Sequence, residues 1–241
     1  MASFYDTTVG QQVEFQRVLA SAGFTDSDIA RIIKEPNLAS TMYVAIQPKA
    51  VATVPSWYVS PEQQLARARQ LWPNAVLPEP PKEFTPRTKS EVLLLHVSDT
   101  FDNLWNKVNA PEGYTKYRWE GVKSDRANLR LAPNKREYTE PVWLAFDPEH
   151  GKGERPDSFW GQADTAASEV FSALIQFPEW SLAWFNGASA PNLTGYQLKY
   201  DGNWSHVPCL GRSDGGRQLK LGGLWADGRG GRWSSPSVRE C

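Results

Sequence analysis

Three histidines and two cysteines are the side chains of this chain best suited to nucleophilic or metal chemistry. His206 stands next to Ser205 and shortly after Asp201, so a Ser–His–Asp arrangement can be written around it. A catalytic triad is defined by geometry and by a third group that orients the base, and closeness in sequence supplies neither. We therefore expect His206 to be a surface or binding residue, and the chain not to be an enzyme.

Metal binding requires His, Cys or carboxylate side chains in a cluster, and the scattered histidines do not provide one. His96 lies inside an apolar run and is expected to be a hydrogen-bonded core residue. Four acidic residues share a single loop, namely Asp147, Glu149, Glu154 and Asp157. Their spacing departs from that of an EF-hand, so they predict a solvated acidic turn. No metal and no other cofactor is expected.

Glycine is the unusual residue of the C-terminal segment, because nine glycines fall between residues 202 and 231. A glycine inside an ordered element costs roughly 0.5–1 kcal/mol relative to alanine, so their number needs a reason. Tight turns explain part of it. Gly222 and Gly223, however, directly follow an alternating stretch that predicts a strand, where small residues would leave an open surface. None of these glycines forms a phosphate-binding motif.

Seven of the eleven tryptophans fall into two groups. The first group has apolar neighbours and predicts core positions: Trp105, Trp143, Trp180 and Trp184. The second stands among polar residues and glycines: Trp204, Trp225 and Trp233. These three either anchor a loop-rich surface by packing into it or are partly exposed and contact a ligand.

The elements of the first half are predicted to be helices. Ser60, Pro61 and Gln63 form a helix-start signal, and the helix ends at Pro73. An earlier helix is predicted from Ser27, with Ile29, Ile32 and Ile33 on one face. Five prolines between residues 73 and 86 predict an extended linker, so we place the main boundary there. Residues 1–88 then form a helical N-terminal region and residues 89–241 a second domain.

The second domain is predicted to be mixed, with β-structure at its end. Apolar runs at 92–97 and 142–146 predict buried strands, and alternation at 196–200 and 218–221 predicts two more. Residues 101–108 and 165–177 carry apolar side chains at helical spacing. The fold class is therefore α+β, a helical N-terminal part followed by a β-rich domain.

Charge and hydropathy limit the partners. The formal net charge of -1 lacks the basic excess of a general nucleic-acid binder. The most apolar window, residues 170–185, is interrupted by Pro178 and Glu179 and is too short to insert into a membrane. The start of the chain lacks the features of a secretory signal, and two cysteines do not form a disulfide framework. The cytoplasm is the default expectation, and surface display by a non-standard route stays open.

Residues 202–240 resemble the C-terminal variable region of diversity-generating retroelement target proteins. The matching pieces are Val207-Pro208-x-Leu210, Arg217-x-Leu219-x-Leu221, Trp225-x-Asp227 and Pro236-Ser-Val-Arg-Glu240. Residues 119–131, 177–180 and 191–195 look more weakly like the preceding part of some bacterial members. The resemblance implies a C-type-lectin-like domain over residues 89–241 with a variable region at about 200–240.

In that family a reverse transcriptase rewrites adenines of Asn codons, which yields small and polar residues. The resemblance thereby explains the glycine surplus. It implies a variable, ligand-binding face that comprises Trp204, His206, Cys209, Gly211, Ser213, Gly215, Gly222, Gly223, Trp225, Gly228, Arg229, Gly230, Gly231 and Trp233. Calcium-dependent sugar binding is not expected, because Trp225-Ala226-Asp227 lacks the middle Asn of the lectin motif.

The leading hypothesis is a non-catalytic protein whose diversified C-terminal surface binds a macromolecular ligand, most simply a protein. Aromatic and arginine residues dominate such interfaces, which favours Trp204, Trp225, Arg229 and Trp233 as contributors. Two alternatives stay open. One is an enzyme similar to the formylglycine-generating oxidases, which would use Cys209 and Cys241, and the other is a carbohydrate-binding module with exposed tryptophans.

Overall fold

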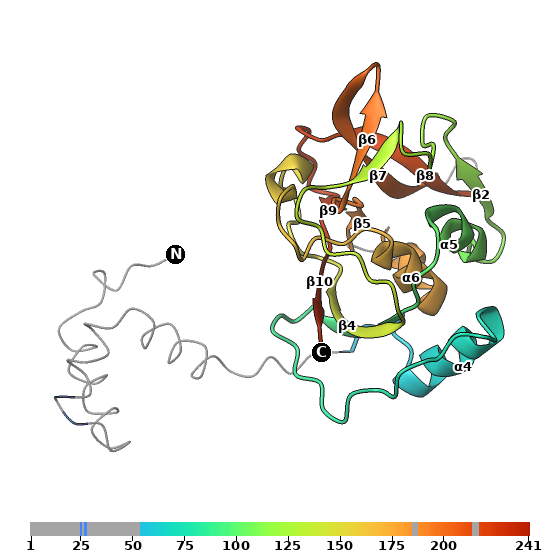
Figure 1. Ribbon diagram of the computed structural model, residues 1–241, viewed down its shortest axis with the longest axis vertical. Coiled ribbons are helices and arrows are strands. Elements are labelled where there is room, and N and C mark those ends of the chain that lie inside the picture. Colours follow the sequence, from blue (N-terminus) through green and yellow to red (C-terminus); the bar gives the residue numbers. More distant parts are fainter. Residues whose placement is uncertain (1–24, 26, 28–53, 185–187, 214–216) are drawn as a thin grey trace. The chain divides into compact units, whose positions relative to one another are not determined.

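The computed structural model describes residues 25, 27, 54–184, 188–213 and 217–241 (Figure 1). The chain divides into two compact units, residues 1–50 and 51–241. Nearly all of the first unit, including the helix predicted after Ser27, lies outside the described residues. The second unit is α+β, with few helices and mostly β-structure.

The division at residue 50 differs from the boundary expected near residue 88. Helix α4 (Pro61–Leu71) buries Leu65 and Ala68 in a cluster that also contains Leu93 and Leu95 of strand β1 (Val92–His96). Leu77 of the proline-rich stretch packs against the same cluster. The helix and the extended segment after it therefore belong to the second unit, because both cover its apolar residues.

Helix α4 begins as its sequence predicts. The Ser60 hydroxyl accepts from the backbone N–H of Gln63 at 3.4 Å, and the Gln63 side chain accepts from the Ser60 N–H at 2.9 Å. This capping box satisfies two N–H groups that a helix leaves unpaired. Gln64 then ties the helix to the strand beside it, since its amide donates to Leu93 O and accepts from Leu95 N.

A three-stranded antiparallel sheet has the order β1-β4-β10, with β4 at Val142–Asp147 and β10 at Ser237–Glu240. Leu93, Leu95 and Trp143 lie in the cluster that contains the α4 residues, whereas Leu94 and Leu144 lie in the main core. Both faces are therefore covered, which explains why β1 and β4 are continuous apolar runs rather than alternating ones. Both strands were predicted correctly.

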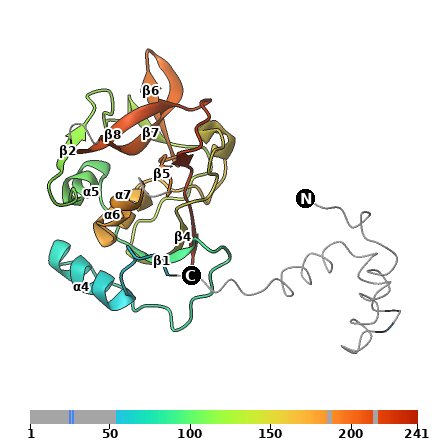
Figure 2. The same ribbon diagram turned by 180° about the vertical axis from the view of Figure 1, so that it is seen from behind.

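A five-stranded sheet has the order β2-β8-β7-β6-β3. Its strands are β2 (Thr115–Arg118), β3 (Leu129–Leu131), β6 (Tyr196–Tyr200), β7 (Asn203–Ser213) and β8 (Gln218–Trp225). Strand β2 runs parallel to β8, and the other pairs are antiparallel. Two short strands, β5 (Ala190–Pro191) and β9 (Trp233–Ser234), pair separately. Figures 1 and 2 show this sheet at the top of the second unit and the three-stranded sheet at the bottom.

Helices α5 (Phe101–Lys107), α6 (Glu169–Gln176) and α7 (Trp180–Ala183) lie between the two sheets (Figure 2). The 3-10 turn η2 (Pro156–Phe159) belongs to the loop after β4. Helix α6 begins four residues later than its apolar pattern predicts. Thr165 forms a bridge with Ser237, and the Ala166 N–H donates to Pro236 O at 2.8 Å. Pairing with the segment at β10 therefore holds these residues extended.

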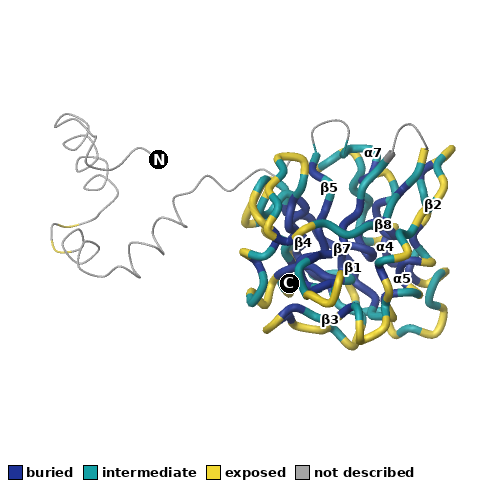
Figure 3. The backbone as a smooth tube through the Cα atoms, turned by 90° about the horizontal axis from the view of Figure 1, so that it is seen from above, coloured by how far each residue is buried: buried dark blue, intermediate teal, exposed yellow. Residues whose placement is uncertain are grey.

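The main core contains side chains of both sheets and of α5 and α6, and Figure 3 shows the buried backbone at the centre of the second unit. His96 is buried there as expected, and its Nδ1 lies 2.8 Å from the Ser172 hydroxyl. Burial lowers the pKa of His96. Lys135 and Glu169 form a buried ion pair with Nζ and Oε1 2.7 Å apart. Burial opposes ionisation of Glu169, but Lys135 and His96 outweigh it and lower the pKa of the carboxyl.

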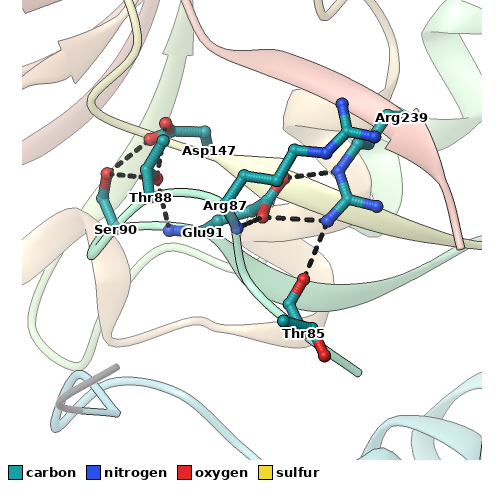
Figure 4. Close-up of polar contacts among 7 residues, drawn as sticks. All are labelled: Thr85, Arg87, Thr88, Ser90, Glu91, Asp147 and Arg239. Carbon is teal, nitrogen blue, oxygen red and sulfur yellow. Dashed lines mark hydrogen bonds and ion pairs between the residues drawn. The ribbon is translucent and has the colours of Figure 1, made fainter. Parts of the chain in front are cut away.

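The acidic loop after β4 is not a solvated turn throughout. Asp147 is buried and accepts from the hydroxyls of Thr88 at 2.8 Å and Ser90 at 2.6 Å (Figure 4). Beside it, Arg239 forms a two-pronged ion pair with Glu91, at 2.9 and 3.0 Å (Figure 4). These contacts attach both β4 and the C-terminal strand β10 to the segment before β1. In the part of the chain that the structure describes, no helix is long and apolar enough to cross a membrane.

Candidate ligand-binding surface

Most residues of the expected variable face lie on β7, on β8 and in the loop that follows β8. The antiparallel register places His206 opposite Trp225, Pro208 opposite Gly223 and Cys209 opposite Gly222. Strand β8 continues through Gly222 and Gly223, so these glycines are strand residues and not turn residues. The pairing brings together positions that lie well apart in the sequence.

Four rings form a continuous row at one end of the five-stranded sheet, and we call Trp119, Tyr200, His206 and Trp225 the aromatic row. Ring centroids are 5.4 Å apart for Trp119 and Tyr200, 4.9 Å for Tyr200 and His206, and 4.1 Å for His206 and Trp225. Trp225 is 57% exposed and Tyr200 37% exposed, whereas His206 between them is 5% exposed. The row is therefore a surface of two accessible rings around a covered imidazole.

The surroundings of the His206 imidazole include one hydroxyl and two acidic residues. Burial lowers its pKa, while the charges of Asp201 and Asp227 act in the opposite direction. Its Nδ1 lies 3.1 Å from the Ser205 hydroxyl, a contact between neighbours in the sequence. Among the described residues no carboxylate is hydrogen-bonded to His206, so the group that orients a catalytic base is missing from the arrangement.

Trp204 belongs to a separate arrangement. The register of β6 and β7 shifts between Leu198 and Lys199, which pairs Lys199 with Trp204 and Tyr200 with Asn203. The guanidinium of Arg130 lies 4.1 Å from the centre of the Trp204 ring, and Lys199 Nζ lies 5.9 Å from it. The Trp204 ring is therefore covered by cations of its own chain, whereas the Trp225 ring is exposed.

A cleft of about 510 Å³ lies beside the other end of β7. Its lining consists of Lys152, Trp184, Ala188, Ser189, Ala190, Gly211, Arg212, Gly231, Arg232 and Trp233. Lys152 pairs with Glu149 at 3.0 Å, and Arg212 lies over the Tyr114 ring at 4.2 Å. Trp184, expected to be a core residue, is only partly buried and lines this cleft.

The glycines of the surface divide by the space around them. A Cβ added at Gly211 would lie 3.6 Å from Trp233, one at Gly222 would lie 3.8 Å from Cys209 Sγ, and one at Gly231 would meet nothing within 4 Å. None of these three has a positive φ. Neither packing nor backbone conformation requires glycine at these positions.

The other glycines are more confined. A Cβ at Gly223 would lie 2.9 Å from Leu198 and 3.0 Å from Trp119, so this residue permits a close approach of two core-side groups. A Cβ at Gly230 would lie 2.8 Å from the Trp233 ring, and one at Gly228 would lie 3.2 Å from the Trp225 carbonyl oxygen. The space beside Gly223 is thus filled by neighbouring side chains, whereas the sequence predicted an open surface there.

The remaining predicted residues contribute unequally. Cys209 is buried, and burial raises the pKa of its thiol to about 12. Arg229 is exposed in the loop after β8. Ser213 ends β7, but its side chain lies outside the described residues, as does Gly215 as a whole.

Sequence reasoning missed Tyr200 and Trp119, which complete the aromatic row, and Arg130, which covers Trp204. Tyr200 carries a signal in hindsight, because it ends a predicted strand just before the Asp201-Gly202 turn. Trp119 and Arg130 carry none, since Trp119 directly follows β2, Arg130 lies on β3, and these two strands are at opposite edges of the sheet.

Among the described residues, no group of three or more His, Cys, Asp or Glu side chains is placed to hold a metal ion. No family model, curated protein or solved structure matches the chain, so its function has to be inferred from the surface itself.

Proposed function

We propose that this chain is a non-catalytic ligand-binding protein whose C-terminal surface is diversified by a retroelement, on a C-type-lectin-like scaffold. The observation that carries the proposal is the space at Gly211, Gly222 and Gly231. All three fall in the segment that resembles a variable region, and all three have room for a Cβ without strain or clash. A surface that tolerates exchange is the physical requirement for diversification without loss of fold.

The matching pieces of the resemblance support the same proposal, because they have structural roles. Val207, Leu210, Leu219, Leu221 and Val238 are all buried. Substitution at such positions would create cavities or strain, so a diversified protein has to keep them. Arg239, in the closing piece, holds the C-terminal strand through its ion pair with Glu91. Buried positions and open positions therefore alternate along one segment.

The first alternative, an oxidase that uses a cysteine pair, finds little support. Cys209 and Cys241 are both free. Cys209 is in β7 of the five-stranded sheet, and Cys241 follows β10 of the three-stranded sheet. A thiol whose pKa is about 12 also supplies almost no thiolate at neutral pH.

The second alternative, a carbohydrate-binding module, draws on exposed Trp225 as a stacking platform. Glycan-array binding that is abolished by Trp225→Ala would favour this alternative over a protein ligand. Silence of the array, with and without calcium, is the result expected from the proposed function.

The gene neighbourhood tests diversification directly. We expect a near-copy of the coding segment for residues 200–240 that differs at adenines, together with a reverse transcriptase gene. If both are missing, the proposal of retroelement diversification fails.

A randomised library tests the binding surface separately. Gly211, Gly222 and Gly231 are replaced together by all residue types in the full chain, and variants are selected against a panel of purified proteins. The control library randomises Leu210, Leu219 and Leu221, which are fully buried. We expect folded binders from the first library only, and equal failure of both would contradict the assignment of this surface.

A further inference from the structure

Two exposed rings at the end of the five-stranded sheet are each accompanied by an aspartate. Tyr200 ends β6 and is followed by Asp201, and Trp225 ends β8 and is followed two residues later by Asp227. Both aspartates are exposed. Since β6 and β8 run in the same direction on either side of β7, the two ring–carboxylate pairs flank His206.

The electric field at His206 agrees with this placement. Asp201 and Asp227 both act on the imidazole, and both favour its charged form. Burial nevertheless lowers the pKa of His206, so the ring between the two carboxylates is neutral at pH 7. The charge of Asp227 also acts on Arg155. That guanidinium is already paired with Asp157, because its Nε donates to Asp157 Oδ1 at 3.0 Å.

Trp204, at the same end of the sheet, is a tryptophan whose ring already has cations beside it. There the chain supplies its own cations, with Arg130 at 4.1 Å and Lys199 at 5.9 Å from the ring centre. Within the described ranges, no lysine or arginine lies over the rings of Trp119, Tyr200 or Trp225. The aromatic row therefore offers aromatic faces and nearby negative charge. Among the described residues it has no cation like the Arg130 guanidinium that lies over Trp204.

We propose that the aromatic row accepts an arginine or lysine side chain of a protein partner, with the cation over the exposed rings and between Asp201 and Asp227. Aromatic faces attract cations through the ring quadrupole, and nearby carboxylates add a direct charge interaction. The proposal rests on the function proposed above, because His206 and Trp225 belong to the expected variable face. It specifies the chemistry of the partner residue at this end of the surface.

The test uses the full chain, labelled with ¹⁵N, and follows the indole N–H signals of its tryptophans. The probe is a peptide of alternating arginine and glycine. Two peptides of equal length serve for comparison, one with citrulline and one with glutamate in place of arginine. Citrulline keeps the shape of arginine and removes its charge. The Trp225 signal is assigned by its loss in Trp225→Leu, and the Trp204 signal serves as an internal reference.

We expect the arginine peptide to shift the Trp225 signal in a saturable manner, with little change at Trp204 and little effect of the other two peptides. Joint replacement Asp201→Asn and Asp227→Asn should weaken binding by about five- to tenfold, as expected for removal of two rim charges. The control pair Glu79→Gln and Glu83→Gln changes the net charge equally, at exposed positions of the segment beside α4. It should leave the affinity within about twofold, the change expected for screened distant charges.

The proposal would be overturned if the citrulline peptide bound as well as the arginine peptide, or if the glutamate peptide bound better. It would also be overturned if the Asp201/Asp227 double variant and the Glu79/Glu83 double variant changed the affinity equally. Binding that shifts Trp204 and leaves Trp225 unchanged, or no binding at all, would overturn it too. Unfolding curves of each variant separate loss of binding from loss of fold. These outcomes are distinct from the library result, since selection at Gly211, Gly222 and Gly231 can succeed whether or not arginine binds the aromatic row.

Discussion

The two sheets use large apolar side chains in opposite ways. In the three-stranded sheet, β1 is buried along its whole length, with α4 on one face and the main core on the other. At the end of the five-stranded sheet, Tyr200 and Trp225 remain 37% and 57% exposed although they lie on regular strands. The side chains of a sheet covered on both faces contribute only to the stability of the fold. Exposed side chains at the end of a sheet are available to bind a partner.

The difference gives each sheet its own sensitivity to substitution. Changes around the covered sheet should alter the free energy of unfolding, and changes at the exposed end should alter binding. Four predictions follow from the contacts, from the largest expected effect to the smallest.

Breaking the buried ion pair should cost most. Glu169→Gln leaves the Lys135 ammonium buried without its carboxylate, and removal of one partner of a buried pair costs about 3–5 kcal/mol. Denaturant unfolding of the variant measures this loss. The double variant Lys135→Met with Glu169→Met removes both charges and should recover much of it. A double variant no more stable than the single one would show that packing, and not charge, dominates the site.

The comparison of the sheets is tested most directly by Leu144→Ala and Trp225→Ala. Leu144 is fully buried in β4, and its truncation should destabilise the chain by about 2–5 kcal/mol. Trp225 is the larger residue, yet its exposure limits the expected loss to about 1 kcal/mol or less. Both values come from parallel denaturant titrations. A larger loss for Trp225→Ala would mean that the aromatic row stabilises the fold.

Adjacent glycines of β8 should respond differently to alanine. Gly223→Ala places a Cβ within 3.0 Å of Leu198 and Trp119, and such overpacking costs about 1–3 kcal/mol. Gly222→Ala meets only Cys209 Sγ at 3.8 Å, so its effect should stay within about 0.5 kcal/mol and can be favourable in a strand. Thermal melts of the two variants measure the difference. Equal destabilisation would contradict the division of the surface glycines into open and confined positions.

Acidification should weaken the fold through His96. Burial lowers its pKa in the folded chain, so below about pH 6.5 the unfolded chain binds more protons than the folded chain. The stabilisation is complete above that pH and decreases as the pH falls, by at most about 1.4 kcal/mol per pH unit for one proton. Unfolding titrations at several pH values measure the slope, with His96→Gln as the comparison. If the variant keeps the full slope between pH 6.5 and 5.5, another group is responsible.

The local elements were predictable because short-range physics determines them. The capping signal at Ser60 predicted α4, the apolar runs predicted β1 and β4, and the helical spacing after Phe101 predicted α5. Prediction failed where a distant segment competes. Helix α6 begins late because residues 165–166 pair with the segment at Pro236 and Ser237, some seventy residues away. Asp147 was misread because its donors, Thr88 and Ser90, precede β1.

By itself the sequence predicted the α+β class, the strands at 196–200 and 218–221, the glycine surplus of residues 202–231 and the resemblance of its last forty residues, but not strand β7. These are properties of neighbouring residues, and periodicity or composition reports them. Only the tertiary structure decided which glycines are open, since Gly222 and Gly223 are identical in sequence and differ in what faces them. It also decided that Trp225 is exposed while Trp204 is covered, because Arg130 on β3 and Lys199 on β6 come to lie over the Trp204 ring only when the strands pair.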